Sequence, residues 1–112
     1  MSNSNIFKVH DENEFDDRVL SSKDPILVGF YAPECEACDT IISRAEQIIE
    51  EKKGKMCLAE VNIAELSELS QKCGVVSGPV LAVAKEGSFH QRLSGLPEKK
   101  EICLFVEEGM KK

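Results

Sequence analysis

The sequence predicts an α/β fold: a three-layer α/β/α sandwich around a central mixed sheet of four to five strands. Residues 26–32 form a continuous apolar run, which is typical of a strand that helices cover on both faces. Strand-like and helix-like segments alternate along the chain, which favours crossovers between parallel strands. Because the chain has 112 residues, we expect residues 1–112 to form one domain.

The first half of the chain is predicted to run β-α-β-α. Residues 6–9 indicate a short strand, and Asp11 is a suitable N-cap for the helix that follows. After the strand at residues 26–32, the apolar positions of residues 39–53 fall on one helix face, and Gly54 ends that helix. These apolar positions are Ile41, Ile42, Ala45, Ile48 and Ile49.

The second half is predicted to run β-α-β-β-α. Residues 56–63 indicate a strand, and a short helix then ends at Gly74. Residues 79–84 and 89–93 flank a turn-forming segment, which indicates an antiparallel hairpin. Pro97 lies where a last helix would begin. Its expected buried stripe is Ile102, Phe105 and Val106.

Charge and composition limit the classes of partner. The formal net charge is −6, which makes nucleic acid and anionic membrane poor partners. The apolar runs are far shorter than a membrane helix requires, and the polar start of the chain does not resemble a signal peptide. The five cysteines are an odd number, which argues against a full disulfide framework. We therefore expect a cytoplasmic protein whose thiols are reduced.

Cys35 and Cys38 are the principal candidates for chemistry. The Cys35-Glu36-Ala37-Cys38 motif follows the apolar run at residues 26–32 and opens a helical segment. A helix N-terminus carries free N–H groups and a partial positive charge, both of which favour a thiolate. A CxxC motif between a strand and a helix in an intracellular chain is typical of a redox dithiol.

Other site chemistries have weaker support. A structural zinc site needs a second pair of ligands, and the sequence has no further CxxC and no closely spaced histidine pair. No phosphate-binding loop or dinucleotide fingerprint is present either. We predict no metal site and no bound cofactor.

Several segments together resemble the thioredoxin family, and the resemblance covers nearly the whole chain. The Gly78-Pro79 pair follows the dithiol at a characteristic distance, with Pro79 44 positions after Cys35. The similar segments are residues 28–38, 60–63, 73–80, 85–88 and 94–95.

The resemblance implies specific roles. Cys35 would attack a substrate disulfide, and Cys38 would resolve the mixed disulfide that forms. Pro79 would be a cis proline beside the dithiol that offers backbone to the substrate, together with Gly78 and Glu34. Disulfide-containing proteins would be the substrates. Electrons would come from an external reductase or a low-molecular-weight thiol, so that the protein takes part in electron transport and cell redox homeostasis.

The chain departs from the family pattern at four places. Glu34 replaces the usual tryptophan, and Glu36-Ala37 replaces the usual Gly-Pro between the cysteines. Gly29 replaces the family's buried acid, and Glu60 replaces the lysine that pairs with it. Two interpretations of Glu60 follow: a relocated proton acceptor for Cys38, or a glutamate that faces solvent at a strand edge.

Carboxylates surround the motif, with Glu34 and Glu36 beside Cys35 and Asp39 after Cys38. Like charge opposes the thiolate and would favour basic substrates, although the same acids could simply be solvated residues at a helix start. Cys57, Cys73 and Cys103 are interpreted as small buried side chains, with Cys73 also a candidate for dimerisation or oxidation.

Two functions from different classes follow. The first is an enzyme, a thiol–disulfide oxidoreductase that reduces protein disulfides. The alternative is a thioredoxin-fold binding module with weak or specialised redox activity, which the loss of the tryptophan, the acid and its lysine would favour. The retention of both Cys35 and Cys38 favours the enzyme.

Overall fold

The computed structural model describes residues 5–111. The strands are β1 (Ile6–Lys8), β2 (Ile26–Tyr31), β3 (Cys57–Asn62), β4 (Val80–Lys85) and β5 (Ser88–Ser94). The helices are α1 (Glu12–Phe15), which continues as a π-helical turn (Asp16–Leu20), α2 (Glu36–Glu51), α3 (Ser67–Lys72) and α4 (Lys99–Met110).

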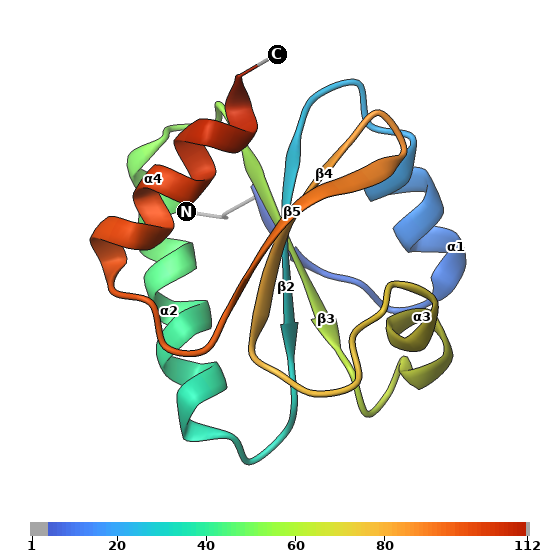
Figure 1. Ribbon diagram of the computed structural model, residues 1–112. Helices are drawn as coiled ribbons and strands as arrows, with labels where there is room; N and C mark the ends of the chain where they lie inside the picture. Colours follow the sequence, from blue (N-terminus) through green and yellow to red (C-terminus); the bar gives the residue numbers. More distant parts are fainter. Residues whose placement is uncertain (1–4, 112) are drawn as a thin grey trace.

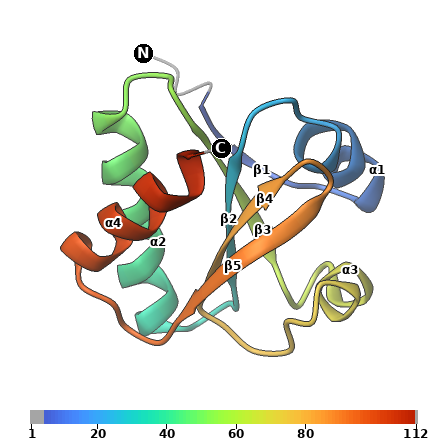
Figure 2. The same ribbon diagram turned by 45° about the horizontal axis from the view of Figure 1, so that its top comes forward.

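The strands form one mixed sheet in the order β1-β3-β2-β4-β5 (Figure 1). β3 pairs in parallel with β1 and β2, whereas β4 pairs antiparallel with β2 and β5. Helices α2 and α4 cover one face of the sheet, and α1 and α3 cover the other (Figure 2). The predicted α/β sandwich with a mixed sheet is therefore confirmed.

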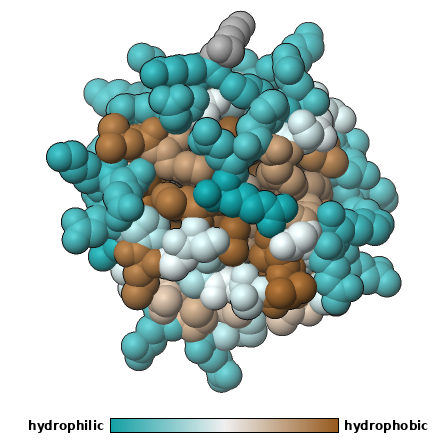
Figure 3. Space-filling view, viewed as in Figure 1, coloured by the Kyte–Doolittle hydropathy of each residue, from teal (hydrophilic) through white to brown (hydrophobic). Residues whose placement is uncertain are grey.

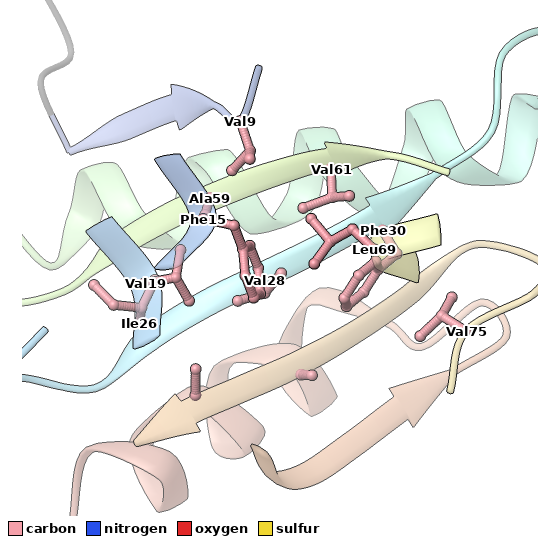
Figure 4. Close-up of a cluster of buried hydrophobic side chains, with 12 residues drawn as sticks. Val9, Phe15, Val19, Ile26, Val28, Phe30, Ala59, Val61, Leu69 and Val75 are labelled. Atoms are coloured by element: carbon pink, nitrogen blue, oxygen red, sulfur yellow. The ribbon is translucent and has the colours of Figure 1, made fainter. Parts of the chain in front are cut away.

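Each face of the sheet has its own apolar core, because side chains alternate between the two faces along a strand. On the α1/α3 face, Phe15, Phe30 and Leu69 belong to a cluster that runs along the sheet (Figure 4). On the α2/α4 face, Ile48 of α2 and Ile102 of α4 belong to a second cluster. Figure 3 shows the outer surface of the side that carries α4 and β5, where hydrophilic side chains surround a more apolar centre.

The predicted position of the dithiol at the start of a helix is confirmed. Helix α2 begins at Glu36, so Cys38 lies within its first turn and Cys35 is its N-cap. The capping prediction for Asp11 is confirmed, because its side chain accepts the backbone N–H of Glu14 at 2.8 Å.

The ends of two other elements also differ from prediction. Pro97 lies before α4 rather than in it, because Glu98 and Glu101 form a capping box that starts the helix at Lys99. Phe105 is only half-buried, whereas Ile102 and Val106 are buried as predicted. Val9 follows β1 and is buried, with its N–H donating to the carbonyl oxygen of Glu60 at 2.9 Å.

Candidate functional site

Cys35 and Cys38 meet at the N-terminus of α2. The Cys35 sulfur accepts the backbone N–H of Cys38 at 3.1 Å, so it occupies the position of an N-cap side chain. This hydrogen bond and the positive end of the helix dipole both favour negative charge on that sulfur. Cys35 is partly exposed, whereas Cys38 is fully buried. The geometry gives one thiol access to a partner molecule and keeps the other one turn deeper.

Burial is the main influence on Cys38. It raises the pKa of the Cys38 thiol, and hydrogen bonding and charge from Cys35 and the charge of Asp39 add to that effect. The backbone N–H of Ala32, which donates to the Cys38 sulfur at 3.4 Å, acts in the opposite direction. Cys38 therefore needs help to lose its proton before it can act as a nucleophile.

Gly78 lies directly against the buried Cys38 thiol, and Pro79 follows it in the chain. The peptide bond between them is cis, and Pro79 is buried. A Cβ atom on Gly78 would lie 3.1 Å from the carbonyl oxygen of Phe30 and 3.4 Å from the Cys38 sulfur. Only a residue without a side chain fits easily here, which is a packing reason for Gly78 that the sequence did not reveal.

Glu34 lies in the turn between β2 and α2, directly before Cys35. It is exposed, and its φ of 55° is in the left-handed region that most residues avoid. Val76, in the loop before Gly78, is the most exposed large apolar residue described, at 82%. The sequence analysis missed Val76, although an apolar residue in a predicted loop is a signal that could have found it.

Glu60 is buried rather than solvent-facing, so the surface interpretation of this residue is wrong. It is 5% exposed and lies on β3 opposite Gly29 of β2. Burial, with a hydrogen bond and charge repulsion from Glu46, raises the pKa of Glu60 to about 8. Neither cysteine is among the groups that shift the pKa of Glu60.

Ile42 fills the space beside Gly29. A Cβ atom on Gly29 would lie 2.7 Å from the Cδ1 atom of Ile42. The replacement of the family's acid by glycine therefore makes room for an apolar side chain of α2, and the carboxyl group of this region is on the neighbouring strand at Glu60.

The remaining cysteines lie on elements that the sequence predicted. Cys57 is on β3, Cys73 caps the end of α3, and Cys103 is inside α4. All three are half-buried free thiols, and burial raises the pKa of each. Arg92 donates hydrogen bonds to the carbonyl oxygens of Cys73 and Gly74, which hold the end of α3 against β5.

Metal and membrane sites were also sought in residues 5–111. Those residues contain no group of three or more histidine, cysteine or acidic side chains that could hold a metal ion. None of the helices described in this range is long and apolar enough to cross a membrane.

Comparison with known proteins gives the same fold. The family model named Thioredoxin matches residues 6–108. The chain belongs to the thioredoxin family. The mitochondrial thioredoxin of Bos taurus is 27% identical over 105 residues, which cover 94% of this chain and 63% of that protein. The thioredoxin of Rickettsia bellii is 27% identical over 99 residues, which cover 88% of this chain and 94% of that protein.

A solved structure is also similar. A mutant thioredoxin from Halobacterium salinarum has a TM-score of 0.85 and 24% identity, with 100% of this chain and 98% of that chain covered. This likeness shows the thioredoxin fold. The chain spans less than two thirds of the length of the first curated relatives that it matches.

Proposed function

We propose that this thioredoxin-family protein is a thiol–disulfide oxidoreductase that reduces protein disulfides through Cys35 and Cys38. The observation that carries the proposal is the Cys35 sulfur at the N-cap of α2, which accepts the N–H of the buried Cys38 at 3.1 Å. An accessible sulfur at a helix N-terminus is suited to attack, and a second thiol one turn away is suited to resolve the product.

The reaction has two steps in this proposal. The Cys35 thiolate attacks one sulfur of the substrate disulfide, and the other substrate sulfur leaves as a thiolate. Cys38 then loses its proton and attacks Cys35, which closes the Cys35–Cys38 disulfide and releases the second substrate sulfur. The substrate gains two electrons, and an external reductase or a low-molecular-weight thiol returns the protein to its dithiol form. Electron donors of this kind are typical of a reducing compartment such as the cytoplasm.

Substrate binding is assigned to the surface beside the dithiol. Gly78 and Pro79 offer backbone next to Cys38, and the exposed Val76 adds apolar area to the same loop. Glu34 and Glu36 place carboxylates on either side of Cys35. Disulfides flanked by basic residues should therefore associate faster than disulfides flanked by acidic residues, and salt should reduce the difference.

Insulin reduction with dithiothreitol as electron donor tests this function. We expect the wild-type protein to accelerate the reaction and both Cys35→Ser and Cys38→Ser to lose that acceleration. Cys103→Ser, which removes a half-buried thiol in α4, is the matched control and should react like the wild type. A reduction potential near ~−270 mV would support a reductant, and one near ~−120 mV would indicate an oxidant. Full acceleration by Cys35→Ser, or none by the wild type, would instead favour the binding module.

A further inference from the structure

The carboxyl group of Glu60 is buried without a full set of partners. The residue is 5% exposed, and its Oε2 atom has no hydrogen-bond partner among the described residues. Buried polar atoms are nearly always paired, and an unpaired carboxyl oxygen costs more than an unpaired neutral group. An oxygen in this position is therefore a candidate acceptor for a hydrogen bond from a ligand.

Glu60 lines a pocket between the sheet and α2 that can hold a small ligand. Its volume is about 260 Å³, which is close to the lower end of the range for small-molecule sites. Asp39 and Glu46 line it from α2, about two helical turns apart and therefore on one side of the helix. Asp39 is exposed and Glu46 is half-buried. The pocket thus brings together three carboxyl groups, one of them buried.

One positive group faces these three carboxyls. Lys8 of β1 is in register with Glu60 of β3 and lines the same pocket. Burial raises the pKa of Glu60 to about 8, with a contribution from Glu46, and the Lys8 ammonium acts in the opposite direction. No ion pair found in residues 5–111 joins Lys8 to any of the three carboxyls. Once Glu60 is ionised, the pocket therefore carries more negative than positive charge.

The other lining residues favour a guanidinium over a metal ion or an ammonium. No group of three acidic, histidine or cysteine side chains in the described part of the chain could hold a metal ion, so these carboxyls do not form a metal site. A guanidinium is planar, presents five N–H donors, stacks on aromatic rings and is more weakly hydrated than an ammonium. Tyr31 supplies an aromatic ring to the pocket, and Ser43 supplies a hydroxyl group.

We propose that the pocket between β3 and α2 binds the guanidinium group of a small guanidine or of an arginine side chain, with Glu60 and Glu46 as its carboxylate partners. This binding site goes beyond the thiol–disulfide function proposed above and does not depend on it. Glu60 must be ionised to act as an anionic partner, because charge-assisted hydrogen bonds are the strong ones. A bound guanidinium therefore lowers the pKa of Glu60 and displaces its proton to solvent.

Titration calorimetry with butylguanidinium tests the site, and butylammonium is a control ligand of the same charge and chain length. We expect saturable binding of butylguanidinium, about tenfold tighter than that of butylammonium. The affinity should fall about tenfold or more from about pH 9 to about pH 6.5, because Glu60 gains a proton over this range. Near pH 7, buffers of different ionisation enthalpy should show that about one proton is released for each ligand bound.

Two variants locate the ligand. Glu60→Gln should weaken butylguanidinium binding about tenfold at about pH 9 and remove both the pH dependence and the proton release. Glu46→Gln should also weaken binding, and it should shift the pH midpoint downward because the repulsion from Glu46 is lost. Glu51→Gln is the matched control, since it removes a carboxylate of the same helix that pairs with Lys99 and does not line this pocket. This control should bind like the wild type.

A third ligand, acetylarginine amide, distinguishes the two sources of the guanidinium, because it joins the arginine side chain to peptide groups. Binding as tight as that of butylguanidinium would assign the pocket to arginine side chains, and weaker binding would assign it to small free guanidines.

Four results would overturn the proposal: no saturable binding to the wild type, equal binding of butylguanidinium and butylammonium, an affinity that does not change with pH, or unchanged affinity in Glu60→Gln. The first three are measured on the wild-type protein, so the test does not require that any variant folds. Because no disulfide takes part in these measurements, their outcome is also independent of whether the protein reduces insulin.

Discussion

The two faces of the sheet are built differently. The α1/α3 face is an apolar core, and the polar side chain buried in it is Ser70, whose hydroxyl has no hydrogen-bond partner. The α2/α4 face has an apolar core of similar extent, but it also holds Cys38 and Glu60. The unpaired oxygen of Ser70 is neutral at every ordinary pH, whereas that of Glu60 belongs to a group that titrates.

Because of this difference, the two faces should contribute to the stability of the fold in different ways. The α1/α3 face stabilises the fold by a free energy that should hardly depend on pH. The α2/α4 face accepts a buried acid next to the helix that carries the thiols, so part of its stability depends on the protonation of that acid. Substitutions on the two faces should therefore differ in size, in pH dependence and in their effect on the dithiol.

The largest effect is expected from Phe15→Ala on the α1/α3 face. Phe15 is 1% exposed, and its ring lies 6.2 Å from that of Phe89. Removal of a buried aromatic side chain leaves a cavity and costs about 3–5 kcal/mol of the free energy of unfolding. Urea denaturation measures this loss. Because neither Cys35 nor Cys38 belongs to the α1/α3 cluster, the reduction potential of the Cys35–Cys38 couple should not change, and a shifted potential would show that the two faces are coupled.

A smaller effect with a distinct pH dependence is expected from Glu60→Gln. The pKa of Glu60 rises from 4.5 in the unfolded chain to about 8 in the fold. Between these values the folded protein holds a proton that the unfolded chain has lost, so its stability must fall as pH rises. Glu60→Gln should remove this fall, which we expect to be roughly 2–4 kcal/mol between about pH 5 and about pH 9.

Ser70→Ala is the matched control for this prediction. This substitution removes the unpaired polar atom of the opposite face. The free energy of unfolding of the variant should change with pH in the same way as that of the wild type. Urea denaturation across the pH range measures all three proteins. If wild type and Glu60→Gln lose stability in parallel as pH rises, Glu60 is not the group that titrates.

The sequence was sufficient to predict the features that depend on local pattern. The apolar run at residues 26–32 predicted a central strand, and the CxxC motif predicted thiols at a helix start. Asp11 predicted a cap because the capping interaction spans only three residues. Each of these signals lies within a short stretch of chain, so no knowledge of the packing was needed.

The sequence could not predict features that arise where distant segments pack together. A glutamate in a strand is usually exposed, and only the position of α2 over β3 buries Glu60. Glu46, whose charge helps to raise the pKa of Glu60, lies 14 residues earlier in the chain, on a helix whose other acidic residues are exposed. The packing of Ile42 beside Gly29 and of Gly78 against Cys38 likewise depends on the fold.

The smallest effects on the free energy of unfolding are expected from substitutions at two glycines on the α2/α4 face. These substitutions test how closely α4 and α2 pack against the sheet. A Cβ atom on Gly109 of α4 would lie 2.6 Å from Val83 Cγ2 and 2.9 Å from Val83 Cγ1. A β-branched valine cannot rotate away easily, so Gly109→Ala should cost about 1–3 kcal/mol despite the better helix propensity of alanine.

The added Cβ of Gly29→Ala would instead meet Ile42 Cδ1, the end of a flexible side chain. Ile42 can move toward the pocket that it lines with Glu60, so this variant should cost less than about 1 kcal/mol. Urea denaturation of the two variants measures the difference, and a greater loss for Gly29→Ala would show that Ile42 is as rigid as Val83. If Ile42 does move, it narrows the pocket. The free energy of unfolding should then stay close to that of the wild type, because the end of the Ile42 side chain can move, whereas the branched side chain of Val83 beside Gly109 cannot move without strain.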